Sequence, residues 1–375
     1  MKIGVYLLSI HHTFLSDFIQ ILDPSSNQIT LFVSAKMKKL LLTLNPSVES
    51  QVSFFVYDGH NLNKYNREVS KKTKNLDYLV VSPNGGRKGT FSHLFLKPKC
   101  RYAFIDILFG DAYLNIYHLF NWDFVSNFIT KSIYKKQMKN ADGILFSSRS
   151  IIEMMKSHLY KKMLFLPFNF YHGENHLKKI EHQGINFTVT GGIEPLRKNY
   201  TVFFEAVELL IKYNIPNLSN IQFIFLGAVK NKETDFADRV INQAKEINKK
   251  AEFELIKIFD ETFIPENIYR EHIAITDFTL NIINMNYYKY GKFCSGMAES
   301  ISYAIPGIYP KDYEILPELE TSSLKYKSGE DLFRIFKKCI NDEEHVTHLT
   351  REAQENAQQF TIEKYRMSFF NFINI

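Results

Sequence analysis

Short apolar runs of strand length alternate along the chain with longer segments in which apolar residues recur at helical spacing. This alternation is typical of parallel sheets that are covered by helices. Seven early runs predict one sheet, with strands within residues 2–8, 28–35, 51–58, 77–83, 101–108, 142–148 and 162–168. Five later runs predict a second sheet, with strands within residues 185–191, 221–227, 253–259, 278–284 and 307–310. The pattern therefore predicts an α/β chain with two doubly wound, Rossmann-like domains.

Segments beside these runs carry apolar residues three or four positions apart, which predicts amphipathic helices. The predicted helices lie within residues 14–22, 150–159, 200–213, 236–249, 297–303 and 329–341. The last stretch, from about Glu352 to Ile375, is also helical in pattern, with Thr361 as its N-cap. Its aromatic side chains need an apolar surface, so we expect this helix to cross back onto the first domain.

A polar segment with little periodicity separates the two series of strands. It predicts a first domain at 1–170, a linker at 171–184, a second domain at 185–355 and a terminal helix at 356–375. Two doubly wound domains that face each other leave a cleft between the carboxyl ends of their strands, where such sheets bind ligands. We therefore expect the functional residues in the loops that lead from strands to helices.

Composition narrows the class of protein. The chain has 375 residues, of which 45% are hydrophobic, so disorder is excluded as its main state. Three scattered cysteines form neither a disulfide framework nor a zinc motif, which favours a reducing cytoplasm. The apolar N-terminal run is interrupted by histidines and reads as a first strand, and no run approaches the length of a transmembrane helix.

The net charge of +6 is unevenly distributed. Residues 1–180 carry 24 Lys and Arg against 12 Asp and Glu, a balance of +12, so the remainder carries −6. A basic half suits phosphates, nucleic acid or an anionic membrane surface, although a solvated lysine-rich face explains the same count. Aromatic residues recur at helical spacing between Tyr113 and Tyr134, which is typical of a core helix or of an interfacial helix on the inner membrane face.

Two loops of the second domain carry the sharpest chemical signals. The first strand is followed by the glycine pair Gly191 and Gly192, and then by the cations Arg197 and Lys198 just before a helix. Glycines let a ligand approach the backbone, and adjacent cations at a helix start suit a diphosphate. An ordinary helix entry with exposed basic residues has the same pattern.

The second loop begins a helix at Ser295 and Gly296, whose backbone N–H groups could hold phosphate oxygens. Glu299 lies about one turn further on and could accept hydrogen bonds from the hydroxyls of a ribose. A serine followed by a glutamate is also a common capping arrangement, so the motif alone leaves both interpretations open.

Taken together, in the order in which they occur along the chain, these motifs resemble those of the donor-binding domain of GT-B glycosyltransferases. The resemblance is closest to the retaining group around glycosyltransferase family 4. Gly192 and Lys198 match the first family motif, Gly227 ends the second strand, and Glu299 matches the second glutamate of the family pair. Residues 139–168 resemble the end of the acceptor domain. The resemblance implies transfer of a sugar from a nucleotide-sugar donor to a glycan or lipid-linked acceptor, in the assembly of bacterial surface polysaccharide or lipopolysaccharide.

The chain also departs from the family pattern. The family arginine after the glycine is Ile193 here, so Arg197 or Lys292 would have to replace it. The first glutamate of the pair falls at Gly291, so the resemblance does not carry over a retaining mechanism. No Asp-x-Asp motif is present, and the resemblance implies neither a metal nor a cofactor.

Candidate catalytic residues lie in the first domain. His11 and His12 follow the first strand and could supply a general base, as in several inverting GT-B groups, or be polar loop residues without a role. Asp106 and Asp111 end another strand, where a carboxylate could orient the acceptor hydroxyl, although Asp111 could also be a helix cap.

Two other functions fit parts of the pattern. A nucleotide-sugar 2-epimerase has the same two-domain scaffold but needs no acceptor. A non-catalytic nucleic-acid-binding protein would explain the basic half, but the chain has no recognised nucleic-acid-binding motif. We therefore expect a nucleotide sugar and a glycan or lipid acceptor as partners, and no nucleic acid.

Overall fold

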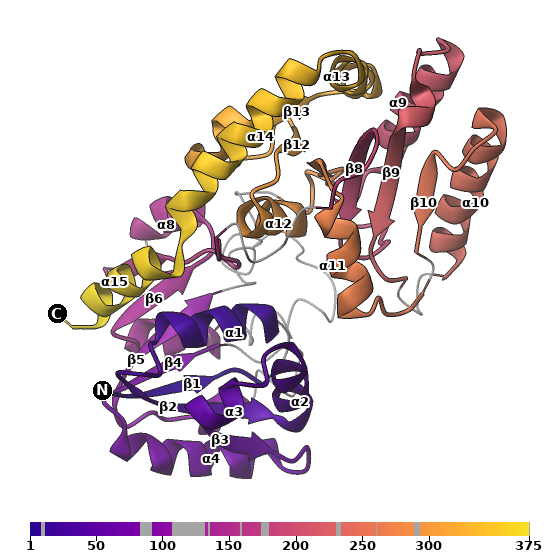
Figure 1. Cartoon of the computed structure of the whole chain (residues 1–375). Coiled ribbons are helices and arrows are strands. Elements are labelled where there is room, and N and C mark those ends of the chain that lie inside the picture. The colour runs from indigo at the N-terminus through magenta and orange to yellow at the C-terminus, as the bar shows by residue number, and fades with distance from the viewer. Residues whose placement is uncertain are drawn as a thin grey trace. The chain divides into compact units, whose positions relative to one another are not determined.

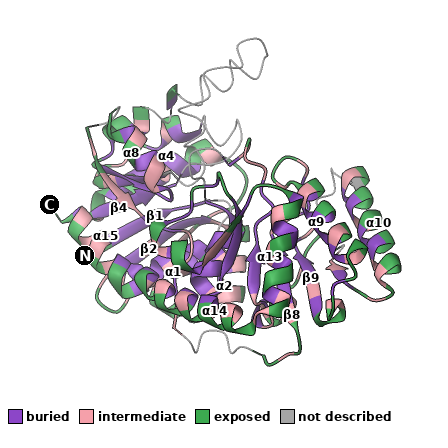
Figure 2. Ribbon diagram, turned by 90° about the horizontal axis from the view of Figure 1, so that it is seen from above, coloured by how far each residue is buried: buried purple, intermediate pink, exposed green. Residues whose placement is uncertain are grey.

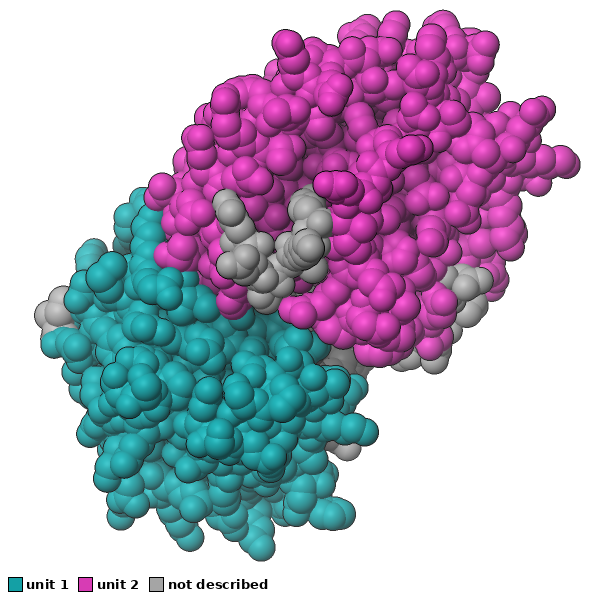
Figure 3. Space-filling model, in the orientation of Figure 1, with its two compact units in different colours: residues 1–169, 362–375 teal, residues 170–361 magenta. Residues whose placement is uncertain are grey.

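The computed structural model describes residues 1–8, 12–82, 92–106, 132–133, 136–157, 160–173, 180–229, 234–259, 261–288 and 293–374 (Figure 1). The chain forms two compact units, coloured separately in Figure 3. Unit 1 comprises Met1–Asn169 and Ile362–Ile375, and unit 2 comprises Phe170–Thr361. The end of the chain thus belongs to the same unit as its beginning.

Unit 1 contains a parallel sheet of seven strands among its described residues, each within a predicted apolar run. In spatial order these are β3 (Ser53–Tyr57), β2 (Gln28–Ser34), β1 (Lys2–Tyr6), β4 (Tyr78–Val81), β5 (Arg101–Asp106), β6 (Gly143–Phe146) and β7 (Lys162–Phe165). Strands β4 and β6 are buried along their whole length, as their unbroken apolar sequences predict. Most strand residues are likewise coloured as buried in Figure 2.

Helices cover both faces of this sheet. Among the described residues they include α1 (His12–Ile21), α2 (Ala35–Leu44), α3 (Val48–Gln51), α4 (Leu62–Lys72), α8 (Arg149–Lys156) and α15 (Ile362–Ile373), with the short 3-10 turns η1 (Thr73–Asn75) and η2 (His93–Phe95). The terminal helix α15 packs on α1, as predicted: the rings of Phe18 and Phe369 lie 5.3 Å apart. Arg366 also donates a hydrogen bond to the carbonyl of Gln20 at 2.8 Å.

Unit 2 contains a parallel sheet of six strands among its described residues. In spatial order these are β10 (Ile256–Ile258), β9 (Ile221–Leu226), β8 (Ile185–Thr190), β11 (Phe278–Leu280), β12 (Gly307–Pro310) and β13 (Ser323–Tyr326). Its helices are α9 (Tyr200–Lys212), α10 (Thr234–Ala251), α11 (Glu266–Ala274), α12 (Ser295–Tyr303), α13 (Gly329–Asn341) and α14 (Glu343–Ala357), with 3-10 turns η3 (Leu218–Asn220), η5 (Pro317–Ser322) and η6 (Gln358–Phe360).

Strand β9 shows how this sheet is covered on both faces. Phe223 and Phe225 belong to the large apolar cluster that includes α9 and α13. Ile224 and Leu226 alternate with them and join a second cluster with Ile273 of α11. Because successive side chains of a strand point to opposite faces, a continuous apolar run places this strand between two layers of helices. The two doubly wound, Rossmann-like domains are therefore confirmed.

Some elements are absent from the sequence prediction. Strand β13 has no unbroken apolar run, because it lies at the edge of the sheet and Tyr326 alone of its residues is buried. Helix α14 begins at Glu343, earlier than predicted, and buries few residues along a polar surface. Helix α11 was also not predicted. A prediction that rests on hydrophobic pattern therefore misses weakly apolar elements at the periphery of the fold.

Candidate functional site

The candidate site lies in unit 2, where the strand order of the sheet reverses. Strand β8 lies between β9 and β11, and the loops after β8 and β11 pair with each other. The amide of Asn199 donates to the carbonyl of Ile282 at 2.6 Å, and that of Asn284 donates to the carbonyl of Arg197 at 2.9 Å. Doubly wound sheets bind ligands beyond the carboxyl ends of their strands at such a reversal.

The turn after β8 depends on two glycines that the sequence singled out. Gly191 has a φ of +81°, a left-handed conformation that favours glycine. A Cβ atom on Gly227, at the end of β9, would lie 2.0 Å from the carbonyl oxygen of Gly191. Backbone therefore packs directly on backbone here. Gly192 has more space around it than Gly227, since a Cβ atom there would lie 3.1 Å from the nearest atom, the carbonyl oxygen of Ala228.

Lys198 reaches back to this turn from the start of α9. Its ammonium group donates hydrogen bonds to the carbonyl oxygens of Thr190, at 2.9 Å, and of Gly191. Burial lowers the pKa of Lys198 to about 7, while the nearby Glu194 carboxylate opposes that shift. An ammonium group has three N–H donors, so one donor remains for a further acceptor at the edge of the sheet.

Arg197 has different partners from its neighbour. Its guanidinium forms an ion pair with Glu194 at 3.2 Å and lies 5.2 Å from the ring centre of Tyr287. Glu194 is buried, like its neighbour Ile193. The two adjacent cations therefore do not act as one cluster: Lys198 is bound to the turn, and Arg197 is bound to a carboxylate and an aromatic ring.

The N-terminus of α12 contacts the same turn. Ser295 donates a hydrogen bond to the carbonyl of Thr190 at 3.2 Å. A Cβ atom on Gly296 would lie 1.9 Å from the side-chain oxygen of Asn281, so a glycine fits this position. Cys294, the N-cap residue, makes no side-chain capping hydrogen bond. The N-terminal end of α12 and the Lys198 ammonium thus meet at one turn, an arrangement suited to an anion.

Glu299 lies one helical turn further along α12 and is paired with Tyr269 of α11. The phenol of Tyr269 donates to a carboxylate oxygen of Glu299 at 2.6 Å. Burial raises the pKa of Glu299 to about 7, and the hydrogen bond from Tyr269 opposes this shift. The second carboxylate oxygen is not used in this hydrogen bond, so it can accept one from a ligand hydroxyl.

The structure thus brings Gly191, Gly227, Lys198, Ser295 and Gly296 together, with Glu299 one turn away. The sequence reasoning missed four further contributors: Tyr269, Asn281, Thr190 and Glu194. The positions of Thr190 and Asn281 could have been inferred, because each ends a strand at the reversal of strand order. Nothing in the sequence pattern links Tyr269 to Glu299.

The candidate residues of unit 1 are placed in part. His12 is the first residue of α1, and Asp106 is the last residue of β5, so both belong to the carboxyl edge of the first sheet. Three candidates lie outside the described residues: His11, Asp111 and Lys292. The same holds for Gly291 and for residues 113–131 of the aromatic segment.

The described residues contain no metal-binding cluster and no helix suited to crossing a membrane. No group of three His, Cys, Asp or Glu side chains there is arranged to hold a metal ion. No helix there is both long enough and apolar enough to cross a membrane.

Comparison with known proteins shows similarity in structure but not in sequence. No protein-family model matches the chain, and no curated protein matches it. Anabaena Alr3699/HepE, solved with UDP and glucose, aligns with a TM-score of 0.67 and 14% identity, over 100% of this chain and 99% of that one. Sucrose-phosphate synthase from Thermosynechococcus elongatus aligns with a TM-score of 0.65 and 10% identity, over 100% and 98%.

A third similar structure is described as trehalose-6-phosphate from E. coli bound with UDP-2-fluoro glucose. It aligns with a TM-score of 0.66 and 10% identity, over 100% of this chain and 99% of that one. These alignments span both units, and they confirm the predicted GT-B fold. At such identities the similarity concerns the fold alone.

Proposed function

We propose that the chain is a glycosyltransferase that moves a sugar from a nucleotide-sugar donor to a glycan or lipid-linked acceptor. The observation that carries the proposal is the turn at Gly191, where Lys198 and the N-terminus of α12 meet at the strand reversal of unit 2. The fold adds support, because proteins that share it have been solved with UDP, glucose and a UDP-sugar analogue.

In this proposal the diphosphate of the donor binds at the turn. Its oxygens would accept hydrogen bonds from the third N–H of Lys198 and from the first backbone N–H groups of α12, near Ser295 and Gly296. Glu299 would accept a hydrogen bond from a ribose hydroxyl through the oxygen that Tyr269 does not use. The Arg197 guanidinium, whose charge is paired with that of Glu194, would border the site without contacting the diphosphate directly.

The chemistry follows from the same contacts. Breaking the bond between sugar and diphosphate leaves negative charge on the leaving phosphate oxygen. Hydrogen-bond donors that are already in place before the reaction stabilise that charge without having to reorganise. Removing one such hydrogen-bond donor from an active site typically lowers the rate about 100-fold or more. Loops at the carboxyl edge of the unit 1 sheet, including His12 and Asp106, would position the acceptor hydroxyl.

The finer assignments are also proposals. The acceptor class, with its role in surface polysaccharide or lipopolysaccharide assembly, rests on the family resemblance and on the basic N-terminal half. The same resemblance supports a reaction without a metal ion.

A thermal-shift panel of nucleoside diphosphates and nucleotide sugars tests the donor site. A ligand present at 100 times its dissociation constant should stabilise the protein by about 2.7 kcal/mol. Replacing Lys198 with Met or Glu299 with Ala should reduce that shift. Lys249→Ala, on the exposed end of α10, is the matched control and should leave the shift unchanged. A wild-type protein that responds to none of these ligands would contradict the proposal.

Product analysis separates transfer from the epimerase alternative. A bound nucleotide sugar that is incubated without an acceptor should keep its sugar configuration. Conversion to the 2-epimer would instead identify the second enzyme class that uses this fold.

A further inference from the structure

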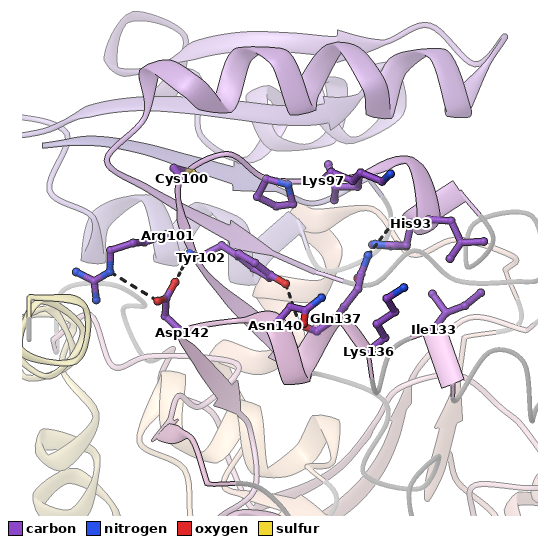
Figure 4. A pocket seen from close by; sticks show the side chains of 13 residues that line it. His93, Lys97, Cys100, Arg101, Tyr102, Ile133, Lys136, Gln137, Asn140 and Asp142 are labelled. Atoms are coloured by element: carbon purple, nitrogen blue, oxygen red, sulfur yellow. Dashed lines mark hydrogen bonds and ion pairs between the residues drawn. The ribbon is translucent and has the colours of Figure 1, made fainter.

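Unit 1 contains a cavity that the proposed function does not use. Its volume is about 630 Å³, within the usual range for small-molecule sites. It lies at the amino-terminal edge of β5 and β6, because its lining includes Arg101 and Tyr102 at the start of β5 and Asp142 just before β6 (Figure 4). The acceptor residues proposed above belong to the opposite, carboxyl edge of the same sheet.

One part of the lining is apolar. Leu96 and Ile133 are almost fully buried, and they line the cavity together with Pro98 and the ring of Tyr102. Leu94 also lines the cavity and is 45% exposed, so it offers more open apolar surface than Leu96 and Ile133 do. The cavity thus offers an apolar surface that water alone would solvate poorly.

The charged groups of the lining are divided between two ends. At one end Arg101 and Asp142 form an ion pair at 3.9 Å, and Asp142 also accepts the Tyr102 amide N–H at 2.8 Å. Lys97 and Lys136 lie at the other end, beside His93 (Figure 4). The negative charge of Asp142 is therefore partly neutralised at its own end of the cavity.

The lysine end carries net positive charge. Among the described residues, neither Lys97 nor Lys136 forms an ion pair, and both are exposed. Burial lowers the pKa of His93 to about 4, so this imidazole is neutral at pH 7 and adds no charge of its own. Two lysines beside an apolar wall, in the half of the chain with a balance of +12, attract an anion that also has an apolar part.

We propose that this cavity binds an anionic amphiphile, a small molecule with one phosphate or carboxylate head and an apolar body. The head lies between Lys97 and Lys136, and the body lies along Leu94, Leu96 and Ile133. This inference is independent of the nucleotide site, because the cavity lies in unit 1 and shares no residue with that site.

Calorimetric titration of the full chain with octyl phosphate, below its micelle concentration, tests the inference. Saturable binding is expected, with octanol and inorganic phosphate each at least about tenfold weaker because each lacks one of the two contacts. The double variant Lys97→Gln/Lys136→Gln should bind octyl phosphate about 30-fold more weakly. Leu94→Asn should also weaken it, and the partial exposure of Leu94 makes this change compatible with folding.

The chain offers a matched control. Lys99 and Lys139 are exposed on the same two segments but do not line the cavity, so Lys99→Gln/Lys139→Gln should bind octyl phosphate like the wild type. Circular dichroism checks that each variant is folded. Three results would each overturn the inference. Octyl phosphate binding could weaken equally in both double variants, octanol could bind as tightly as octyl phosphate, or the wild type could show no saturable binding.

Vesicles of phosphatidylglycerol identify the source of the amphiphile. Co-sedimentation that requires Lys97 and Lys136 would assign the ligand to a membrane surface. Octyl phosphate binding without such co-sedimentation would assign it to a free molecule in solution.

Discussion

Six strands of each sheet follow the same order, yet the contacts at the two reversal points are built differently. In unit 1, the Ser34 hydroxyl at the end of β2 donates to the carbonyl of Leu8 at 2.7 Å and accepts the amide N–H of Met37 at 3.2 Å. In unit 2, Gly227 at the end of β9 packs its backbone on the carbonyl of Gly191. The end of β2 thus contacts Leu8 through a side chain, whereas the end of β9 contacts Gly191 backbone to backbone. The shared fold therefore locates a possible site, while the turn residues decide which chemical groups it presents.

The largest expected effect comes from filling the backbone contact of unit 2. In Gly227→Ala the added Cβ would lie 2.0 Å from the Gly191 carbonyl oxygen, and a backbone atom cannot move aside as a side chain can. We expect the free energy of unfolding to fall by about 3 kcal/mol. Urea denaturation measures the loss, and nucleotide binding should weaken with it because the turn must shift.

The neighbouring glycine provides the control for this change. A Cβ atom on Gly192 would lie 3.1 Å from the Ala228 carbonyl oxygen, a contact that a shift of a few tenths of an ångström relieves. Gly192→Ala should therefore cost far less stability than Gly227→Ala. Equal losses from the two substitutions would show that the turn tolerates no side chain at all, and that the Gly227 contact is not special.

Two buried groups, His93 of unit 1 and Glu299 of unit 2, contribute to the pH dependence of stability in opposite directions. In unit 1, burial lowers the pKa of His93 to about 4 from an ordinary value of 6.5, so the folded state binds fewer protons than the unfolded state between these values. The stabilisation that comes from a neutral, buried His93 is therefore complete above about pH 6.5 and is lost as the pH falls towards 4. In unit 2, burial raises the pKa of Glu299, so the corresponding contribution is lost as the pH rises through about 7.

Acidification should therefore destabilise unit 1 through His93. Between about pH 7.5 and pH 5 the expected loss from this residue is about 2 kcal/mol. Hydrogen exchange of the amides in β1 and β4 measures the stability of unit 1 at each pH. His93→Gln, which cannot take up a proton, should flatten the dependence by that amount. An identical pH slope in wild type and variant would assign the acid sensitivity to other groups.

Removing the side chain that spans the turn of unit 1 should have a smaller effect. Ser34→Ala loses the hydrogen bond to Leu8 and the cap of α2, and an N-cap is typically worth about 1 kcal/mol. Urea denaturation again measures the change, with Ser50→Ala, an exposed serine near the end of α3, as the control. Donor binding should not change, since Ser34 belongs to unit 1 and the proposed donor site lies in unit 2.

Hydrophobic pattern predicted the two sheets because most strands are buried on both faces, and this produces unbroken apolar runs. The turn at Gly191 and the start of α12 were also predictable, since glycine pairs and helix starts leave local signals. The Tyr269–Glu299 pair was not. The two residues are 30 positions apart, and their contact depends on how α11 packs beside α12. The partners of Arg197 and Lys198 likewise depend on loop geometry that adjacent sequence does not encode.

The smallest expected effect tests that unpredicted pair. A carboxylate accepts a hydrogen bond from a ribose hydroxyl better when it is ionised, so the contribution of Glu299 to donor binding should strengthen as the pH rises through about 7. The pKa of Lys198 is also about 7, so its loss of charge over this range weakens the diphosphate contact equally in wild type and variant. Burial and the nearby Glu266 raise the pKa of Glu299, whereas the hydrogen bond from Tyr269 lowers it. Tyr269→Phe removes this hydrogen bond, so the pKa of Glu299 should rise further. The midpoint of the binding profile should therefore move to higher pH.

Nucleotide titrations of wild type and Tyr269→Phe across this pH range measure the shift. Near pH 7.5 the variant should bind a few-fold more weakly, and at higher pH the two proteins should converge, because Glu299 is then ionised in both. Glu299→Gln is the control and should show no such midpoint. If Tyr269 merely supported the packing of α11, the variant would bind more weakly by the same factor at every pH. Convergence at high pH therefore distinguishes an electrostatic role of the phenol from a structural one.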